Sequence, residues 1–173
     1  MIVVLLGYMG SGKSLIGKKL AQTLGCDFVD LDSHISDKIN LSISEIFSQK
    51  GEIFFRKQEA LLLNELLNAK KPMVLATGGG TPCYGNNMLD ITESSGVQSI
   101  YLKTSVQELV TRLFPEKDQR PLIAHLDSKE VLDDFIRKHL FDRNPYYMQA
   151  NYKINTDGKA PQEIVREIVV QLF

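Results

Sequence analysis

The sequence has little of what builds disulfide-bonded, metal-clustered or membrane-spanning proteins. Its two cysteines, Cys26 and Cys83, are too few for a disulfide framework and lack the spacing of metal ligands. No apolar run approaches the roughly twenty residues that cross a bilayer, and the apolar N-terminal run is too short, and lacks the basic leader, for a secretion signal. We therefore expect a soluble, cytoplasmic protein with no membrane partner.

A surplus of charge of one sign is also missing. The 20 basic and 21 acidic residues leave a formal net charge of -1, so the chain has no general attraction for nucleic acid and any anion site has to be local. With 173 residues, of which 43% are hydrophobic, the chain is long enough for one substantial core and too short for two. We expect a single domain over residues 1–173, and a monomer.

One segment near the N-terminus indicates a ligand. Residues 7–14, GYMGSGKS, follow an apolar run and fit the phosphate-binding pattern G-x-x-x-x-G-K-[ST] at every fixed position. The glycines let successive backbone N–H groups point at phosphate oxygens, and the helix that follows presents its positive end to the same anion. Lys13 would supply mobile positive charge and Ser14 a hydroxyl for Mg²⁺. The nucleotide residues expected from this phosphate loop are Gly10, Ser11, Gly12, Lys13, Ser14 and Leu15.

Short β-branched runs alternate with amphipathic stretches along the chain. Parallel strands need a long connection back across the sheet, so this alternation predicts an α/β fold with parallel strands and helices on both faces. Capping-box spacing at Ser42…Glu45 and Ser105…Glu108, together with Pro161, indicates three helix starts. The five predicted strands cover residues 2–6, 28–30, 73–76, 98–102 and 152–154.

Two carboxylates follow the second predicted strand, where ligands collect in open α/β sheets. Asp30 and Asp32 flank Leu31, and an extended backbone would send both carboxylates into the crevice that holds the phosphates. One could hold Mg²⁺ through water while the other accepts a hydroxyl proton, or Asp32 could merely cap a helix beginning near His34. Because the third strand ends without the usual aspartate, Asp30 is the nearest candidate for the metal.

Three consecutive glycines, Gly78, Gly79 and Gly80, follow the third strand. Such a run leaves backbone N–H groups bare and lets a ligand approach the main chain, which is more than a flexible turn requires. Arg56 and Glu59 lie three residues apart on a helix predicted from about residue 52 to 67, so Glu59 could hold the guanidinium for a planar anion. A solvated surface pair is the alternative.

The segment from about residue 114 to 128 has poor periodicity, which is typical of a functional lid. Its Arg120 could reach the charge that develops on a transferred phosphoryl group, and closure would keep water from competing as acceptor. Arg112 stands at the entry of the segment, where it could lie beside the nucleotide base or phosphates. Arg143 lies near the end of the next predicted helix.

Taken together, these elements resemble the shikimate kinase family in order and spacing over essentially the whole chain. They are the phosphate loop, D-L-D at 30–32, F-R-K-Q-E at 55–59, the triple glycine at 78–80, R-P-L at 120–122 and Arg143 with Tyr147. The resemblance implies a P-loop NTPase of the nucleoside-monophosphate-kinase-like type, with three layers around a five-stranded parallel sheet of order 2-3-1-4-5. It also implies a lid at about 114–128 and a substrate-binding helical region at about 32–60.

The activity that the resemblance implies is transfer of the γ-phosphoryl group of ATP to the 3-hydroxyl of shikimate, in the pathway to chorismate and aromatic amino acids. Asp32 would hold the shikimate hydroxyls and help accept the proton. Arg56 and Arg143 would bind the carboxylate, with backbone contacts from residues 78–80. Lys13 and Arg120 would stabilise the phosphoryl group in transfer. Mg²⁺ would be ligated by Ser14, with Asp30 behind it through water.

Some residues depart from the pattern of the family. Residues 155–161 resemble its adenine loop but lack the arginine that some members place there, which leaves Arg112 and Pro161 as the expected contacts of the base. Gluconate kinase is the nearest alternative enzyme, but Ile35 stands where that family has proline. A GTP-dependent switch is disfavoured because no N-K-x-D or D-x-x-G follows the loop, and an inactive binding protein because the carboxylate pair and the lid arginine remain.

Overall fold

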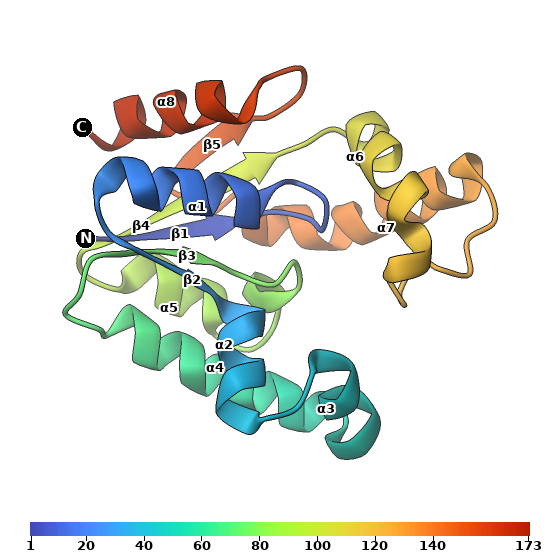
Figure 1. Cartoon of the computed structure of the whole chain (residues 1–173), viewed down its shortest axis with the longest axis horizontal. Coiled ribbons are helices and arrows are strands. Elements are labelled where there is room, and N and C mark those ends of the chain that lie inside the picture. The colour runs from blue at the N-terminus through green and yellow to red at the C-terminus, as the bar shows by residue number, and fades with distance from the viewer.

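Five parallel strands form one sheet in the computed structural model, which describes residues 1–173 (Figure 1). β1 lies at the centre, paired with β3 through Ile2↔Met73 and with β4 through Ile2↔Val97. The predicted strands, their parallel pairing and the order β2-β3-β1-β4-β5 are confirmed. The strands are β1 (Ile2–Leu6), β2 (Asp27–Asp30), β3 (Met73–Ala76), β4 (Val97–Lys103) and β5 (Tyr152–Asn155).

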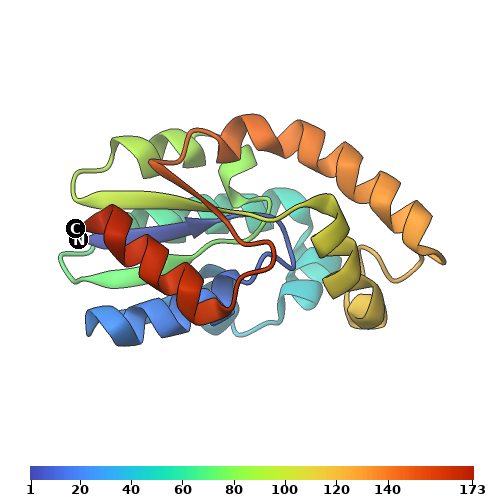
Figure 2. The same ribbon diagram turned by 90° about the horizontal axis from the view of Figure 1, so that it is seen from above.

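Helices cover both faces of the sheet, so the molecule has three layers. Helices α1 and α8 lie on one face and α4, α5 and α7 on the other, as the view from above shows (Figure 2). None of the helices combines the length and the apolar character needed to cross a bilayer. The helices are α1 (Lys13–Leu24), α2 (Leu31–Ile39), α3 (Ile43–Lys50), α4 (Glu52–Leu67), α5 (Asn87–Glu93), α6 (Val106–Leu113), α7 (Lys129–Tyr147) and α8 (Pro161–Leu172), with 3₁₀ turns η1 (Thr81–Cys83) and η2 (Phe114–Gln119).

Successive side chains of β1 point to opposite faces of the sheet, so the strand contributes to two separate hydrophobic clusters. Ile2, Val4 and Leu6 belong to the larger hydrophobic cluster, on the side of α4, α5 and α7, whereas Val3 and Leu5 pack with α1 and α8. All five residues are buried. A strand covered on both faces reads as a continuous apolar run, which is why β1 was recognisable in the sequence.

Side-chain caps account for two of the predicted helix starts. At α3, Ser42 Oγ accepts a hydrogen bond from the N–H of Glu45 at 3.2 Å, and Glu45 Oε2 accepts one from the N–H of Ser42 at 2.8 Å, so the capping box is complete. At α6, Ser105 Oγ accepts from the N–H of Glu108 at 3.2 Å, but the Glu108 carboxylate pairs with Arg112 instead. The predicted box at α6 is therefore only half formed.

The turn after β2 is tighter than the sequence suggested. Helix α2 begins at Leu31 and not near His34, so Asp32 lies on the first helical turn and the argument from an extended backbone is wrong. Asp30, not Asp32, is the helix cap, and its Oδ1 accepts from the N–H groups of Asp32 and Ser33 at 3.2 and 3.4 Å. The strand ends at Asp30 as predicted, and the helix follows it without the expected extended residues.

The segment expected to act as a lid has more order than its sequence indicates. It begins with η2 and continues as turns to Ser128, whose Oγ caps α7 by accepting from the N–H of Val131 at 3.2 Å. Ile123 and Leu126 are buried in the larger core cluster. The second half of the segment is thus anchored to the core, and its action as a lid stays a prediction.

Candidate active site

A cleft of about 620 Å³ opens at the carboxyl ends of the strands, the edge where open α/β sheets bind their ligands. It brings together every residue predicted for the nucleotide and the metal. Asp32 and the first two glycines of the triple glycine line the same cleft. The predicted nucleotide and metal residues along its wall are Gly10, Ser11, Gly12, Lys13, Ser14, Leu15, Asp30, Arg112, Arg120 and Pro161, the last being the first residue of α8.

The phosphate loop has the backbone geometry of an anion site. Gly10 and Gly12 adopt φ values of +80° and +93°, which side chains other than glycine rarely tolerate. Helix α1 starts at Lys13 with no side-chain cap on its first N–H groups. Uncapped N–H groups and the positive end of the helix dipole therefore face the cleft, as phosphate binding requires.

Lys13 is held by the backbone of the phosphate loop. Its Nζ donates to the carbonyl of Gly7 at 2.7 Å and to that of Tyr8 at 3.0 Å. Burial lowers the pKa of this ammonium to about 8, and the neighbouring Asp32 and Asp30 carboxylates act in the opposite direction. An incoming polyphosphate would stabilise the protonated form and offer oxygens in place of the two carbonyls.

Ser14 and Asp30 form the oxygen pair expected at a magnesium site. Ser14 Oγ donates to Asp30 Oδ2 at 2.8 Å across the mouth of the cleft. No group of three or more His, Cys, Asp or Glu side chains in the structure could hold a metal alone. Mg²⁺ commonly takes one or two protein oxygens and completes its shell with water and substrate phosphates, so this pair fits that ion in the presence of a nucleotide.

The Arg56–Glu59 pair on α4 is not a solvated surface pair. Glu59 is 1% exposed, and its Oε2 accepts from Arg56 Nη1 at 2.8 Å while its Oε1 accepts from Thr81 Oγ1 at 2.7 Å. The centre of the Tyr84 ring lies 3.7 Å from Arg56 Cζ. Arg56 Nε is buried, lies 3.6 Å from Glu52 Oε1 and makes no hydrogen bond. The guanidinium is therefore fixed in orientation by a buried carboxylate and an aromatic face, with a donor left over.

Three side chains from three different helices converge on the triple glycine. The atoms nearest to an added Cβ are Asp32 Oδ1 at 3.1 Å for Gly78 (after Thr81 Oγ1 at 3.0 Å), Arg143 Nη1 at 3.4 Å for Gly79 and Arg56 Nη2 at 3.1 Å for Gly80. The Tyr147 hydroxyl donates to the carbonyl of Gly79 and so ties this loop to α7. The absence of side chains at residues 78–80 is what lets one carboxylate and two guanidinium groups approach the same stretch of backbone.

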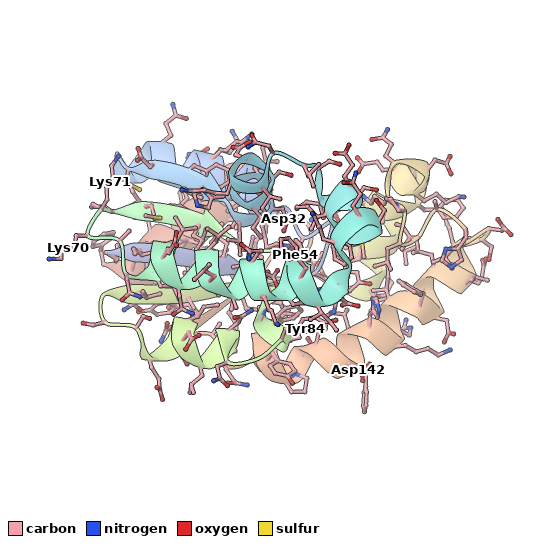
Figure 3. All side chains as sticks on the ribbon, turned by 90° about the horizontal axis from the view of Figure 1, so that it is seen from below. Asp32, Phe54, Lys70, Lys71, Tyr84 and Asp142 are labelled. Carbon is pink, nitrogen blue, oxygen red and sulfur yellow. The ribbon has the colours of Figure 1, made fainter.

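Asp32 lies among opposing charges. Burial, together with the charges of Asp30 and Glu59, raises the pKa of the Asp32 carboxyl to about 6, while Lys13 and Arg56 act to lower it. Figure 3 shows Asp32 in the middle of the molecule, above the α4 ribbon. A carboxylate with a pKa of about 6 is ionised at neutral pH and close to the range in which it can accept a proton in a reaction.

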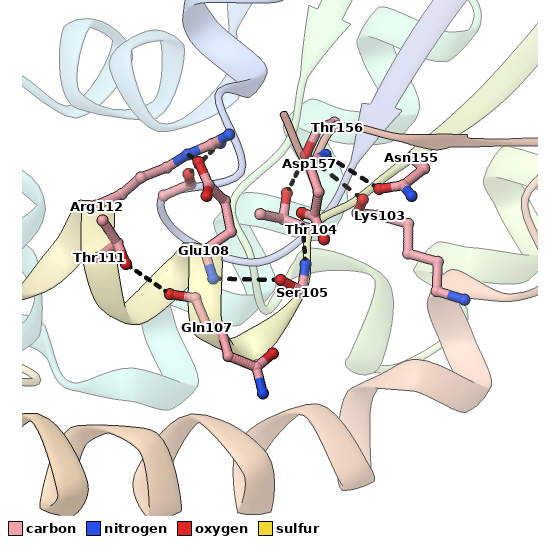
Figure 4. A network of polar contacts seen from close by, with 11 residues as sticks. Lys103, Thr104, Ser105, Gln107, Glu108, Thr111, Arg112, Asn155, Thr156 and Asp157 are labelled. Carbon is pink, nitrogen blue, oxygen red and sulfur yellow. Dashed lines mark hydrogen bonds and ion pairs between the residues drawn. The ribbon is translucent and has the colours of Figure 1, made fainter. Parts of the chain in front are cut away.

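Arg112 is connected to both the phosphate loop and the neighbouring helix turn. Its Nη1 donates to the carbonyl of Gly10 at 3.2 Å and its Nε to Glu108 Oε1 at 2.9 Å (Figure 4). In the same network the buried hydroxyls of Thr104 and Thr156 are 2.7 Å apart, which joins the end of β4 to the loop after β5. The loop at residues 155–161 is therefore fixed against the segment that leads into α6.

Arg120 lines the cleft but pairs with a residue of its own segment. Its Nη2 donates to Glu116 Oε2 at 3.1 Å, and both residues line the cleft. Glu116 and Lys159 were not predicted as site residues. Lys159 lines the cleft from the 155–161 loop and contacts Glu167 at 2.7 Å. Lys159 lies in the loop where the family pattern has an arginine, so its positive charge was a signal in the sequence for a site residue.

Comparisons with known proteins agree over nearly the full length. The family model for shikimate kinase matches residues 9–173. A shikimate kinase of Flavobacterium psychrophilum is 47% identical over 171 residues, covering 99% of this chain and 98% of the relative. The crystal structure of a shikimate kinase from Bacteroides thetaiotaomicron matches with a TM-score of 0.89 at 32% identity, covering 99% of this chain and 98% of the other. A shikimate kinase from Acinetobacter baumannii in complex with shikimate gives a TM-score of 0.85 at 34% identity, covering 99% and 92%.

Proposed function

The chain belongs to the shikimate kinase family, and from this membership we propose that its cleft transfers the γ-phosphoryl group of ATP to the 3-hydroxyl of shikimate. The products are shikimate 3-phosphate and ADP, in the pathway to chorismate and aromatic amino acids. The single observation that supports this choice of acceptor is the convergence of Asp32, Arg56 and Arg143 on the triple glycine beside the phosphate loop.

Shikimate carries one carboxylate and vicinal hydroxyl groups, and the side chains that converge on the triple glycine have a complement for each. Asp32 lines the cleft, whereas Arg56 and Arg143 lie against Gly80 and Gly79 and are not part of its lining. We assign Arg56 and Arg143 to the carboxylate, because guanidinium groups bind a planar anion through paired N–H donors. Asp32 is assigned to the hydroxyls, with the backbone of residues 78–80 close to the ring. Glu59 holds Arg56 by a 2.8 Å contact, so this arginine needs little reorganisation on binding.

The nucleotide side of the cleft takes ATP. The phosphate loop from Gly10 to Leu15 supports the phosphates, Lys13 exchanges its two carbonyl acceptors for phosphate oxygens, and Arg112 and Pro161 are assigned to the region of the base. Ser14 and Asp30 would hold Mg²⁺, Asp30 through water. When bound, this ion neutralises charge on the phosphate oxygens.

Positioning and charge neutralisation account for most of the expected acceleration. Asp32, ionised at neutral pH, accepts the proton of the acceptor hydroxyl as the new phosphorus–oxygen bond forms. Arg120 exchanges Glu116 for the phosphoryl group when its segment closes, and closure keeps water from acting as acceptor.

We infer that the enzyme acts as a monomer in the cytoplasm, without a membrane or nucleic-acid partner. All of the assigned side chains come from one chain. Both cysteines are free thiols, which suits a reducing compartment.

A coupled assay of ADP release tests the function. Purified protein is supplied with ATP and Mg²⁺ and is offered shikimate, gluconate or no acceptor. Turnover that depends on shikimate supports the proposal. Turnover with gluconate alone, or equal ADP release without any acceptor, contradicts it, and omission of Mg²⁺ with excess chelator should abolish the signal.

The two arginines give the first residue-level prediction. Arg56→Ala and Arg143→Ala should each weaken shikimate binding about thirtyfold or more, because each removes charged hydrogen bonds to the carboxylate, and should change ADP binding little. Calorimetric titrations with both ligands measure this. Arg137→Ala is the matched control, since Arg137 lies on the same helix as Arg143 and pairs with Asp133 away from the cleft. Equal losses for both ligands would contradict the assignment.

A further inference from the structure

We propose that Tyr8, in the phosphate loop, is a positioning residue for the acceptor: its ring and hydroxyl hold α7 so that Arg143 faces the triple glycine. The inference rests on the proposed function, since Arg143 is the residue assigned there to the shikimate carboxylate. Tyr8 belongs to the nucleotide side of the site by sequence, because it is the second residue of the phosphate loop.

The two assigned arginines are held in different ways. Arg56 has a buried carboxylate partner in Glu59. Arg143 takes part in no ion pair. Its guanidinium carbon lies 5.5 Å from the centre of the Tyr8 ring, within the distance at which a cation is attracted to an aromatic face.

An aromatic face orients a guanidinium without using its hydrogen-bond donors. The five N–H groups of arginine lie in the plane of the guanidinium, whereas a ring contacts the face of that plane. An ion pair would occupy the same donors that a substrate carboxylate needs and would offset the positive charge. Tyr8 therefore leaves the charge of Arg143 uncompensated and does not itself occupy the N–H donors.

The hydroxyl of Tyr8 makes a second contact with the same helix. It lies 2.9 Å from His139 Nδ1, one helical turn before Arg143 on α7. The His139 ring is held in turn by Phe135, at a centroid distance of 4.5 Å. Tyr8 is 2% exposed and His139 is half-buried, so this contact between residues 131 positions apart in the sequence is partly buried. One side chain of the loop thus fixes two successive turns of α7.

The backbone of Tyr8 is engaged on the nucleotide side. Its carbonyl accepts from Lys13 Nζ at 3.0 Å, the lysine assigned to the phosphates. A single residue therefore contacts a cation on each side of the reaction, Lys13 through its carbonyl and Arg143 through its ring. This double contact distinguishes Tyr8 from the other buried aromatic residues of the core.

A double-mutant cycle tests the proposal with steady-state kinetics. Tyr8→Leu keeps an apolar side chain but removes both the ring and the hydroxyl, and should raise the KM for shikimate about fivefold to tenfold while the KM for ATP stays within about twofold. Tyr8→Phe keeps the ring and should recover most of the loss. In an Arg143→Ala background, Tyr8→Leu should have little further effect on the KM for shikimate, because the residue through which it acts is gone.

A purely structural role for Tyr8 gives different results. It would raise the KM for ATP and the KM for shikimate together, or lower stability with no selective effect on either KM. It could also raise the KM for shikimate by the same factor with and without Arg143. Each of these outcomes rejects the proposal. If Tyr8→Leu does not fold, Tyr8→Met takes its place, since an unbranched side chain fills irregular space. If neither folds, Tyr8→Phe is used: it loses only the hydroxyl contact with His139 and should raise the KM for shikimate about twofold in the wild-type background and not in the Arg143→Ala background. No rise at all, or an equal rise in both backgrounds, rejects the proposal.

The two proposals fail in distinguishable ways. Wild-type protein that does not phosphorylate shikimate contradicts the proposed function. Wild-type turnover of shikimate that is insensitive to Tyr8 contradicts only the positioning role.

Discussion

At the scale of single residues, the environment of Asp32 predicts how activity depends on pH. Burial and the nearby Asp30 and Glu59 charges raise its pKa to about 6. A carboxylate accepts a proton only when ionised, and its ionised fraction falls as the pH drops through that value. We therefore expect kcat/KM for shikimate to decline below a pH of about 6, and not near the ordinary aspartate pKa of about 4. A pH–rate profile measures this limb.

The Asp32→Asn variant separates the chemical step from nucleotide binding. Turnover should fall by about a hundredfold or more because the proton acceptor is lost, while ADP binding stays near that of the wild type. The acid limb should disappear from whatever activity remains. Asp134→Asn is the control, since that carboxylate is 64% exposed on α7 and pairs only with Lys138. Near-normal turnover in Asp32→Asn would show that this carboxylate does not take the proton.

At the scale of elements, the triple-glycine loop should tolerate a methyl group without unfolding. A Cβ at Gly80 would lie 3.1 Å from Arg56 Nη2, a side-chain atom that has to shift by only a few tenths of an ångström, and Gly80 has a negative φ of -88°. Gly80→Ala should therefore displace the guanidinium and raise the KM for shikimate about fivefold, with the melting temperature nearly unchanged. A large loss of thermal stability with an unchanged KM would contradict this reading of the loop.

Helix α1 gives the opposite expectation for the same substitution. A Cβ at Gly17 would overlap the ring of Phe28, where the helix packs closely on the sheet. Gly17→Ala should reduce the free energy of unfolding by about 1–3 kcal/mol, because the helix or the ring has to move. Denaturant unfolding measures the loss, and Gly80→Ala serves as its comparison. An unchanged midpoint would mean that Phe28 repacks freely.

Elements differed in how well the sequence predicted them. Strands such as β1 and β3 are buried on both faces and so carry strong apolar signals. The start of α2 was misplaced although the end of the strand at Asp30 was predicted, because Asp30 and Asp32 are both good N-cap residues and no local pattern decides between them. Glu108 was expected to complete a capping box, but Arg112 competes for its carboxylate. Tertiary partners decided both cases.

At the scale of the whole molecule, the site residues on standard motifs were predictable and their supporting contacts were not. Lys13 and Ser14 follow from the phosphate-loop pattern, whose spacing is fixed by backbone geometry. The ion pair of Arg56 was predicted, but its burial required α4 to pack against η1. His139 had no signal at all, because its partner Tyr8 is 131 positions away. Contacts across such distances depend on the topology of the sheet.

Hydrogen exchange can test whether the segment at residues 114–122 closes over the cleft when the substrates bind. If residues 114–122 close over the cleft when ADP and shikimate are both bound, their amides should exchange about tenfold or more slowly than in the free protein. Amides of β1 and β3, which are buried in the sheet, should change much less. Mass-spectrometric exchange of the free, ADP-bound and doubly bound protein makes the comparison. Equal protection in all three states would show that the segment does not close.

The central place of β1 has a consequence for biosynthesis. Of the five strands β1 is synthesised first, yet its two neighbours in the sheet start at Met73 and Val97. At roughly 5–20 residues per second, several seconds pass before β3 has been translated, and longer before β4 has. During that interval β1 and the phosphate loop attached to it have no partner strand. Nascent chains arrested before residue 97 should accordingly be captured by chaperones more readily than longer ones.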